Sequence, residues 1–153
     1  MNIPTLVSTL GAVVSIAVSV IALIYARQSV HESRHSRNLQ ALMELYAQHM
    51  SSPLRELRGR VVHTDEFADL ATAPFGPRHQ EVHALLGLYE MLGAFSRNKM
   101  VDIDLVFALF PKSVVTCYER LQPYIAVYRE RANHPRFAHN FEWLAKRYGP
   151  YFA

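Results

Sequence analysis

The order of hydrophobic and polar positions divides the chain into one long uncharged stretch and a series of shorter helical patterns. Leu6 to Tyr25 is twenty residues without a charge, and eleven of them are Leu, Ile or Val. As a helix this stretch is about 30 Å long, which matches the hydrocarbon thickness of a bilayer. Because a soluble helix is rarely apolar on all sides over five turns, the pattern predicts a membrane-spanning helix.

The residues on either side of this stretch argue against a cleaved signal peptide and set an orientation. The first five residues carry no Lys or Arg, and the apolar core is longer than the roughly 7–15 residues of a signal peptide. Arg27, Arg34 and Arg37 follow within twelve residues. The positive-inside rule therefore predicts a single-pass protein of the inner (plasma) membrane, with the N-terminus outside and the C-terminal domain in the cytoplasm.

Small side chains recur along this helix at alternating steps of four and three residues. Such a seam lets helix backbones approach closely in lipid, and its mean step of 3.5 residues predicts a left-handed crossing. We expect one continuous helix from Leu6 to Met50 that self-associates as a homo-oligomer. The alternatives are an unrelated membrane partner or no partner at all. The seam positions are Ser8, Ala12, Ser15, Ser19, Ala22, Ala26, Ser29 and Ser33, with Ser36 continuing the series.

Beyond residue 37 the apolar positions keep a helical spacing, and no window alternates like a β-strand. Ser52 and Asp102 are expected to cap helices at their N-termini, and Pro123 is expected to kink or restart the chain. The expected elements are a helix carrying Leu54 to Val62, a turn at Asp65–Leu70, and helices at Arg78–Arg97, Leu105–Phe110, Ser113–Leu121, Ile125–Tyr128 and Phe137–Tyr148. The fold class is therefore all-α: a transmembrane helix and stalk at 1–37, then a compact cytoplasmic bundle of about five or six short helices at 38–153.

Composition narrows the function classes only slightly. The net charge of +3 and the pI near 9.2 are mildly basic, and nothing points directly to nucleic acid. The single Cys117 excludes an internal disulfide and a zinc cage built from cysteines. It lies in an apolar run without a neighbouring cation, so we interpret it as a packing residue. No cofactor is predicted.

His79 and His83 are four residues apart, which places two imidazoles on one helix face within reach of a metal. Their order differs from the His-Glu-x-x-His pattern of zinc proteases, so Glu81 cannot be the general base. A third ligand would have to come from His63, Asp65 or a neighbouring chain. The alternative is a pair of surface histidines at the start of a helix.

Arginines form two clusters that are candidates for an anion or ligand site if their helices meet. A guanidinium is well suited to a phosphate group, so the ligand class would be a phosphate-bearing small molecule. The alternative is a solvated helix face. The four residues are Arg55, Arg58, Arg129 and Arg131.

Glu90 follows Tyr89 on an otherwise apolar helix and therefore needs a partner, for which we expect Arg120 or Arg129. The sequence contains no nucleophile elbow, phosphate-binding glycine loop or kinase signature. We predict no catalytic residue and no enzymatic activity.

Four blocks of the sequence resemble an uncharacterised family of small bacterial and phage membrane proteins, which have one N-terminal membrane helix and a helical domain of unknown function. The resemblance covers nearly the whole chain and implies the same architecture, but it brings no assigned activity. The blocks are Leu88-Tyr89-Glu90-Met91-Leu92-Gly93, Val101-Asp102-Ile103-Asp104-Leu105-Val106, Leu121-Gln122-Pro123-Tyr124-Ile125 with Arg129, and Phe141-Glu142-Trp143-Leu144-Ala145.

The function expected from these observations is a membrane-anchored, self-associating helical protein whose cytoplasmic domain binds a protein partner or a small ligand. The lipid bilayer and a second copy of the chain are its other expected partners. An alternative is a ligand-gated effector that disrupts the membrane, for example in antiviral defence. A metal-dependent hydrolase, which would depend on His79 and His83 alone, ranks last.

Overall fold

A computed structural model of the chain describes residues 3–72, 75–110 and 112–151. The side chains of residues 3–18, 20, 24, 30–32, 34, 35, 77 and 151 lie outside that description. The chain divides into two compact units, Met1–Asn38 and Leu39–Ala153. This division lies next to the domain boundary expected from the sequence at residues 37 and 38.

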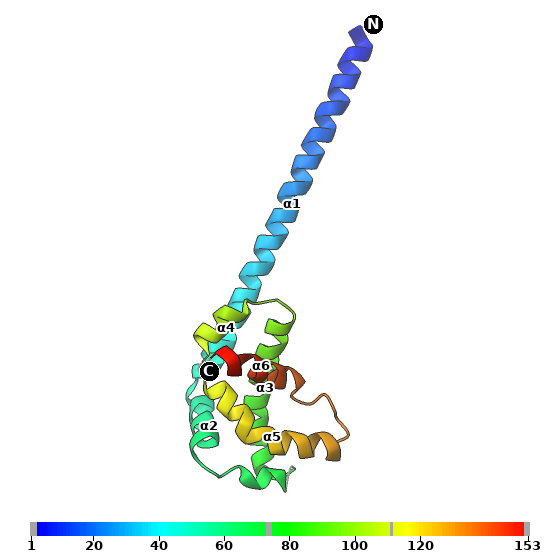
Figure 1. Cartoon of the computed structure of the whole chain (residues 1–153). Helices are drawn as coiled ribbons and strands as arrows, with labels where there is room; N and C mark the ends of the chain where they lie inside the picture. The colour runs from blue at the N-terminus through cyan, green and yellow to red at the C-terminus, as the bar shows by residue number, and fades with distance from the viewer. Residues whose placement is uncertain (1–2, 73–74, 111, 152–153) are drawn as a thin grey trace. The chain divides into compact units, whose positions relative to one another are not determined.

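The part of the chain that the structure describes folds into seven helices and no strand, which confirms the all-α class (Figure 1). Six are α-helices and one is a short 3₁₀-helix, η1. Their bounds are α1 Ile3–Met50, α2 Ser52–His63, η1 Ala68–Ala71, α3 Pro77–Arg97, α4 Ile103–Leu109, α5 Ser113–Arg131 and α6 His139–Tyr151.

The first helix is continuous from Ile3 to Met50, as the sequence predicts. None of the helices, as far as their residues are described, is long and apolar enough to be identified as a membrane span. Most side chains of the predicted span Leu6–Tyr25 lie outside the description, and so do those of Ser8, Ala12 and Ser15. The remaining positions of the predicted seam are all exposed: Ser19, Ala22, Ala26, Ser29, Ser33 and Ser36.

The predicted restart at Pro123 is wrong, because α5 continues through this proline to Arg131, whereas the alternative of a kink stays a prediction. A proline inside a helix costs about 3 kcal/mol, since it lacks an N–H and crowds the preceding turn. Leu121 lies before the proline and Tyr124 and Ile125 follow it, and all three are buried in the domain core. Their burial holds both halves on one helical path, and each contributes about 1.5–3 kcal/mol.

The two predicted helix caps have different outcomes. The carboxylate of Asp102 accepts a hydrogen bond from the Asp104 amide at 2.9 Å, so the predicted cap of α4 is confirmed. Ser52, by contrast, is the first residue of α2, and Ser51 takes the capping position. The Ser51 hydroxyl donates to the Gln48 carbonyl at 2.6 Å, so it caps the end of α1 instead of the start of α2.

The closest helix packing in the domain joins α3 to α6. A Cβ atom placed on Gly93 would overlap the backbone carbonyl of Asn140, so only glycine permits this approach. One turn earlier on α3, Glu90 lies opposite the first amides of α6. The segment Leu88–Gly93 of α3 therefore provides the surface against which α6 packs.

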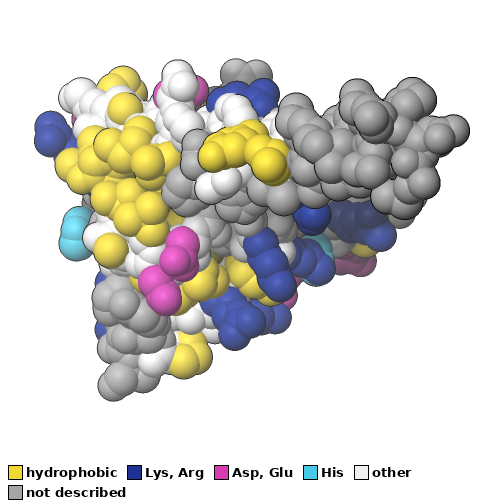
Figure 2. Space-filling model, turned by 90° about the horizontal axis from the view of Figure 1, so that it is seen from above, with side chains coloured by type: hydrophobic (Ala, Val, Ile, Leu, Met, Phe, Trp, Pro, Cys, Tyr) yellow, Lys and Arg dark blue, Asp and Glu magenta, His cyan; other side chains and the backbone are white. Residues whose placement is uncertain are grey.

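Several large apolar side chains of the second unit stay outside the core, among them Met43, Met50, Phe75 and Met91. Figure 2 shows hydrophobic side chains gathered in a patch on one face of the molecule, and Lys and Arg side chains gathered elsewhere on the same face. The domain therefore carries apolar surface that its own core does not use.

Candidate functional site

The first turns of α3 bring two histidines against aromatic side chains of α5 and of the segment that follows α5. The rings of His79 and His83 lie 4.1 Å apart between their centroids. The Tyr128 ring stacks on His79 at 5.2 Å, and the Phe137 ring lies 5.3 Å from His83. Nδ1 of His79 is hydrogen-bonded to the Tyr124 hydroxyl. We call these five residues the His79–His83 cluster.

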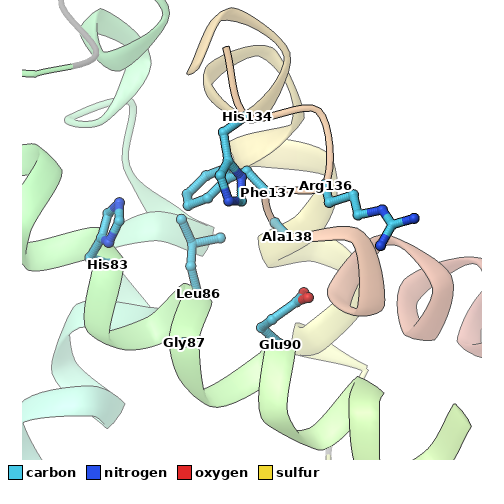
Figure 3. A pocket seen from close by; sticks show the side chains of 8 residues that line it. All are labelled: His83, Leu86, Gly87, Glu90, His134, Arg136, Phe137 and Ala138. Carbon is cyan, nitrogen blue, oxygen red and sulfur yellow. The ribbon is translucent and has the colours of Figure 1, made fainter. Parts of the chain in front are cut away.

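A pocket of about 180 Å³ opens beside this cluster, between α3 and the segment 132–138 (Figure 3). His83, Leu86 and Gly87 line it from α3, and Phe137 lies across from them. Most of its wall is apolar, and ionisable side chains stand among the lining residues. The full lining is His83, Leu86, Gly87, Glu90, His134, Arg136, Phe137 and Ala138.

The segment that forms one wall of the pocket is fixed at both ends by unusual backbone conformations. Asn133 and Ala138 have φ angles of 49° and 53°, in the left-handed region that costs a non-glycine residue about 1–2 kcal/mol. Such strain persists only where surrounding contacts hold it, and it is frequent at binding sites. Ala138 is buried and lines the pocket itself.

Arg129 provides the contacts that hold this segment. Its Nε donates to the Phe137 carbonyl at 2.8 Å, and its Nη2 lies 2.9 Å from a carboxylate oxygen of Glu142 on α6. Arg129 therefore clamps the pocket segment to α6. The guanidinium also lowers the pKa of the Glu142 carboxyl, a shift in which Lys146 is the larger cause.

His83 has the chemical features expected of a ligand-binding group. Its Nε2 is buried and has no hydrogen-bond partner among the described residues. Burial lowers the pKa of His83, and the neighbouring His79 lowers it further, so the ring is neutral near pH 7. An unpaired buried polar atom costs about 1–3 kcal/mol, and a ligand that pairs with it recovers that cost. The neutral ring can donate or accept one such bond.

Glu90 does not pair with Arg120 or Arg129, so that expectation is wrong. Its carboxylate accepts hydrogen bonds from the Asn140 backbone amide at 3.2 Å, the Asn140 side-chain amide at 2.9 Å and the Phe141 amide at 2.9 Å. Glu90 thus caps the N-terminus of α6, where the helix dipole favours a negative charge.

A second histidine site lies in the core of the domain and has no opening. His49 is fully buried, and the rings of Tyr89 and Phe110 lie 5.9 and 5.0 Å from its ring. Nη1 of Arg58 lies 2.7 Å from His49 Nε2 and donates to the His49 carbonyl at 3.0 Å. Burial, assisted by the charge of Arg58, lowers the pKa of His49 to about 4.

Cys117 and Tyr89 complete the surroundings of Arg58. The predicted burial of Cys117 is confirmed, and it raises the pKa of the thiol to about 12. Burial also raises the pKa of Tyr89 well above its usual value. Both groups are neutral at physiological pH, so the thiol is a packing group in this environment, and the charge of Arg58 acts on His49.

The four predicted arginines do not converge on one site. Arg58 turns into the core, where it acts on Cys117, whereas Arg129 lies twelve residues further along α5, about 18 Å at 1.5 Å per residue. Arg131 donates to the Thr72 carbonyl at 3.3 Å, and Arg55 is exposed. Two of them, Arg58 and Arg129, therefore hold the structure together.

The predicted metal pair does share a helix face, but its surroundings differ from either expectation. His79 and His83 are partly buried among aromatic rings instead of lying free on the surface. Asp65, a proposed third ligand, pairs with Arg120 at 2.8 Å, and His63 is exposed. Within the described residues no three His, Cys, Asp or Glu side chains form a group that could hold a metal ion.

Sequence reasoning missed the residues on the second wall of the pocket. Asn133-His134-Pro135 indicates only a helix break, and Phe137 is predicted only as the first residue of the last helix. One sequence signal points to such a segment. Tyr124 and Tyr128 on α5 and His79 and His83 on α3 are spaced to form one aromatic surface, and burying that surface requires a further apolar segment packed against it.

The fold and the pocket together define a small all-α domain preceded by a long N-terminal helix. Over residues 11–148 the chain matches the family model described as "Domain of unknown function (DUF4760)", and it belongs to this family. No curated protein and no solved structure matches the chain. The resemblance noted in the sequence is confirmed at this level, as a family without an assigned activity.

Proposed function

We propose that the protein is a single-pass, self-associating anchor in the inner membrane whose cytoplasmic domain senses a small ligand without enzymatic activity. The observation that carries the sensing role is the pocket beside His83, with its buried, unpaired Nε2. A domain that leaves a polar atom unpaired beside a pocket retains a cost that a ligand can remove.

The membrane placement is supported by the uncharged stretch Leu6–Tyr25 and by the arginines that follow it. Large side chains near the end of this stretch are exposed: Ile21 by 53%, Leu23 by 71% and Tyr25 by 70%. Lipid would remove this apolar surface from water. Resistance of the chain to extraction from membranes with alkaline carbonate tests the proposal, and release into the soluble fraction would contradict it.

Self-association is supported by the small-residue seam and is tested by cysteine cross-linking. In a Cys117→Ala background, single cysteines at Ser29 and Ser33 should cross-link in membranes with higher yield than cysteines at Val30 and His31. The seam places the first pair at the contact and the second pair away from it. Equal yields from all four positions would remove the seam from the proposal.

The ligand-sensing role is tested by thermal unfolding of the full chain in lipid nanodiscs against a panel of ligands. The panel holds nucleotides, cyclic oligonucleotides, divalent metals, anionic lipid headgroups and small aromatic compounds. A ligand at one hundred times its Kd adds about 2.7 kcal/mol, which raises Tm by several degrees in a domain of this size.

Two glycine variants locate the binding. A Cβ atom meets no other atom within 4 Å at either Gly87, which lines the pocket, or Gly59 on α2, which does not. Gly87→Val should abolish the shift, and Gly59→Val should retain it. A flat panel, or a shift that both variants retain, would contradict the sensing role. Depolarisation of cells by the ligand, lost in Ser15→Leu and Ser19→Leu, would instead favour the effector alternative.

A further inference from the structure

We infer that the pocket beside His83 binds a single-ring aromatic carboxylate: one planar ring in the apolar part and one negative group at the rim. This inference depends on the proposed sensing function, because it names the ligand class of the same pocket. It follows from three properties of the pocket: its volume, the composition of its walls and the charges left without a partner.

The volume sets the size of the ligand. The pocket measures about 180 Å³. An engineered apolar cavity of about 150 Å³ holds one benzene molecule, whereas pockets for drug-sized ligands occupy about 300–1,000 Å³. One six-membered ring with a short substituent therefore fits, and a nucleotide does not fit inside. Among the phosphate-bearing ligands that the sequence suggests, those of nucleotide size are therefore too large to be fully enclosed.

The walls favour a flat apolar body. Leu86 and Ala138 are buried apolar residues of the lining, and Gly87 leaves open space above the α3 backbone. Figure 3 shows Phe137 on the side of the pocket opposite Leu86 and Gly87. A ring placed between them would contact Phe137 in an offset or edge-on arrangement, which adds to the gain from apolar burial.

The charges at the pocket favour an anion. The negative charge of Glu90 is offset by three hydrogen bonds from the start of α6. Arg136 is exposed and makes no ion pair with any residue that the structure describes. Its side chain extends outward from the pocket in Figure 3, so its positive charge is available to a group that projects past the rim. His134 also lines the pocket. The neutral His83 ring donates a hydrogen bond to a carboxylate in the tautomer that carries its proton on Nε2.

Three probes of nearly equal shape separate the alternatives: benzoate, benzyl alcohol and benzylamine. Their binding to the full chain in phosphatidylcholine nanodiscs is measured by titration calorimetry, with empty nanodiscs as the blank. We expect benzoate to bind most tightly and benzylamine most weakly. Arg136→Ala should weaken the affinity for benzoate by about tenfold, which is the effect of one exposed charged hydrogen bond. The affinity for benzyl alcohol should not change. Arg131→Ala, which removes an arginine outside the pocket lining, should leave all three unchanged.

The outcomes distinguish failure of this inference from failure of the proposed function. Tighter binding of benzylamine or benzyl alcohol, abolished by Gly87→Val, would overturn the carboxylate assignment and leave the pocket as a ligand site. Benzoate binding that survives Gly87→Val lies elsewhere on the chain and would also overturn the inference. If none of the three probes binds, the ligand class is wrong, and the panel in nanodiscs decides separately whether the pocket binds any ligand.

Discussion

The domain contains two histidine sites that are built from the same kinds of residue and differ in one respect. His49 is fully buried, and Nη1 of Arg58 lies 2.7 Å from its Nε2 and donates to its carbonyl at 3.0 Å. His83 also packs against aromatic rings, but its Nε2 has no hydrogen-bond partner among the described residues, and a pocket opens beside it. A buried histidine in a small helical domain therefore indicates a binding site only when a nitrogen remains unpaired beside an open space.

The largest expected effect is on stability and belongs to the closed site. His49→Ala removes a ring packed against Phe110 and Tyr89 and leaves Arg58 without its partner, which should cost about 3 kcal/mol of unfolding free energy. His83→Ala removes a ring that borders a pocket and should cost about 1 kcal/mol. Urea unfolding of the full chain in micelles measures both. Equal losses of unfolding free energy in the two variants would contradict the proposed difference between a closed and an open histidine site.

The second prediction concerns pH. His49 has a folded pKa of about 4 and an unfolded pKa near 6.5, so the unfolded state binds the proton more tightly between these values. Its stability contribution is complete above pH 6.5 and is lost as the pH falls, with a loss of about 2 kcal/mol between pH 7.5 and pH 5.

The groups around His49 do not add to this titration. The raised pKa values of Tyr89 and Cys117 keep both groups neutral between pH 5 and pH 7.5. His83 acts in the same direction, since its pKa is also lowered. His49→Gln should therefore flatten the pH profile more than His83→Gln. A profile unchanged by His49→Gln would show that folding does not lower the pKa of His49.

The third prediction concerns the clamp on the pocket segment. Arg129→Ala removes the hydrogen bond to the Phe137 carbonyl and the ion pair with Glu142, both of which are partly buried. The expected cost is about 1.5–2 kcal/mol, together with weaker benzoate binding because the wall is no longer held. Arg131→Ala is the matched control, and its cost should be below about 0.5 kcal/mol. Equal losses of stability and of benzoate affinity in the two variants would show that Arg129 does not hold the pocket segment to α6.

The smallest effect is a stabilisation. Gly87→Ala places a methyl group in open space on α3 and should stabilise the helix by about 0.5–1 kcal/mol. The same methyl narrows the pocket, so benzoate affinity should fall while Tm rises. Gly59→Ala should raise Tm to a similar extent without a loss of affinity. Parallel changes in both variants would show that Gly87 is not at the binding site.

The sequence predicts the helices well because a buried helix face repeats every three to four residues, as Leu42, Leu45 and His49 do on α1. It predicts the Asp102 cap because a cap depends only on neighbouring residues. Pro123 misleads because the burial of Tyr124 and Ile125, which outweighs the proline penalty, depends on the tertiary structure.

The site is only half predictable for the same reason. His79 and His83 are apparent from their spacing, whereas the partner of Glu90 lies fifty residues away on α6 and no local pattern marks it. The structural role of Arg129 likewise cannot be predicted from its charge alone. Its positive charge suggested an anion site, but its position beside Phe137 and Glu142 makes it a structural contact. Pairings between distant segments decide which charges remain free for a ligand.

The most direct test of the central claim is a titration of the full chain with benzoate, followed by nuclear magnetic resonance of ¹⁵N-labelled histidine side chains. His83→Gln and His49→Gln assign the two rings. We expect a saturable change in the His83 ring nitrogens, with those of His49 unchanged, because His83 lines the pocket and His49 does not. A saturable change at His49 with none at His83 would contradict the claim that the open site is the ligand site.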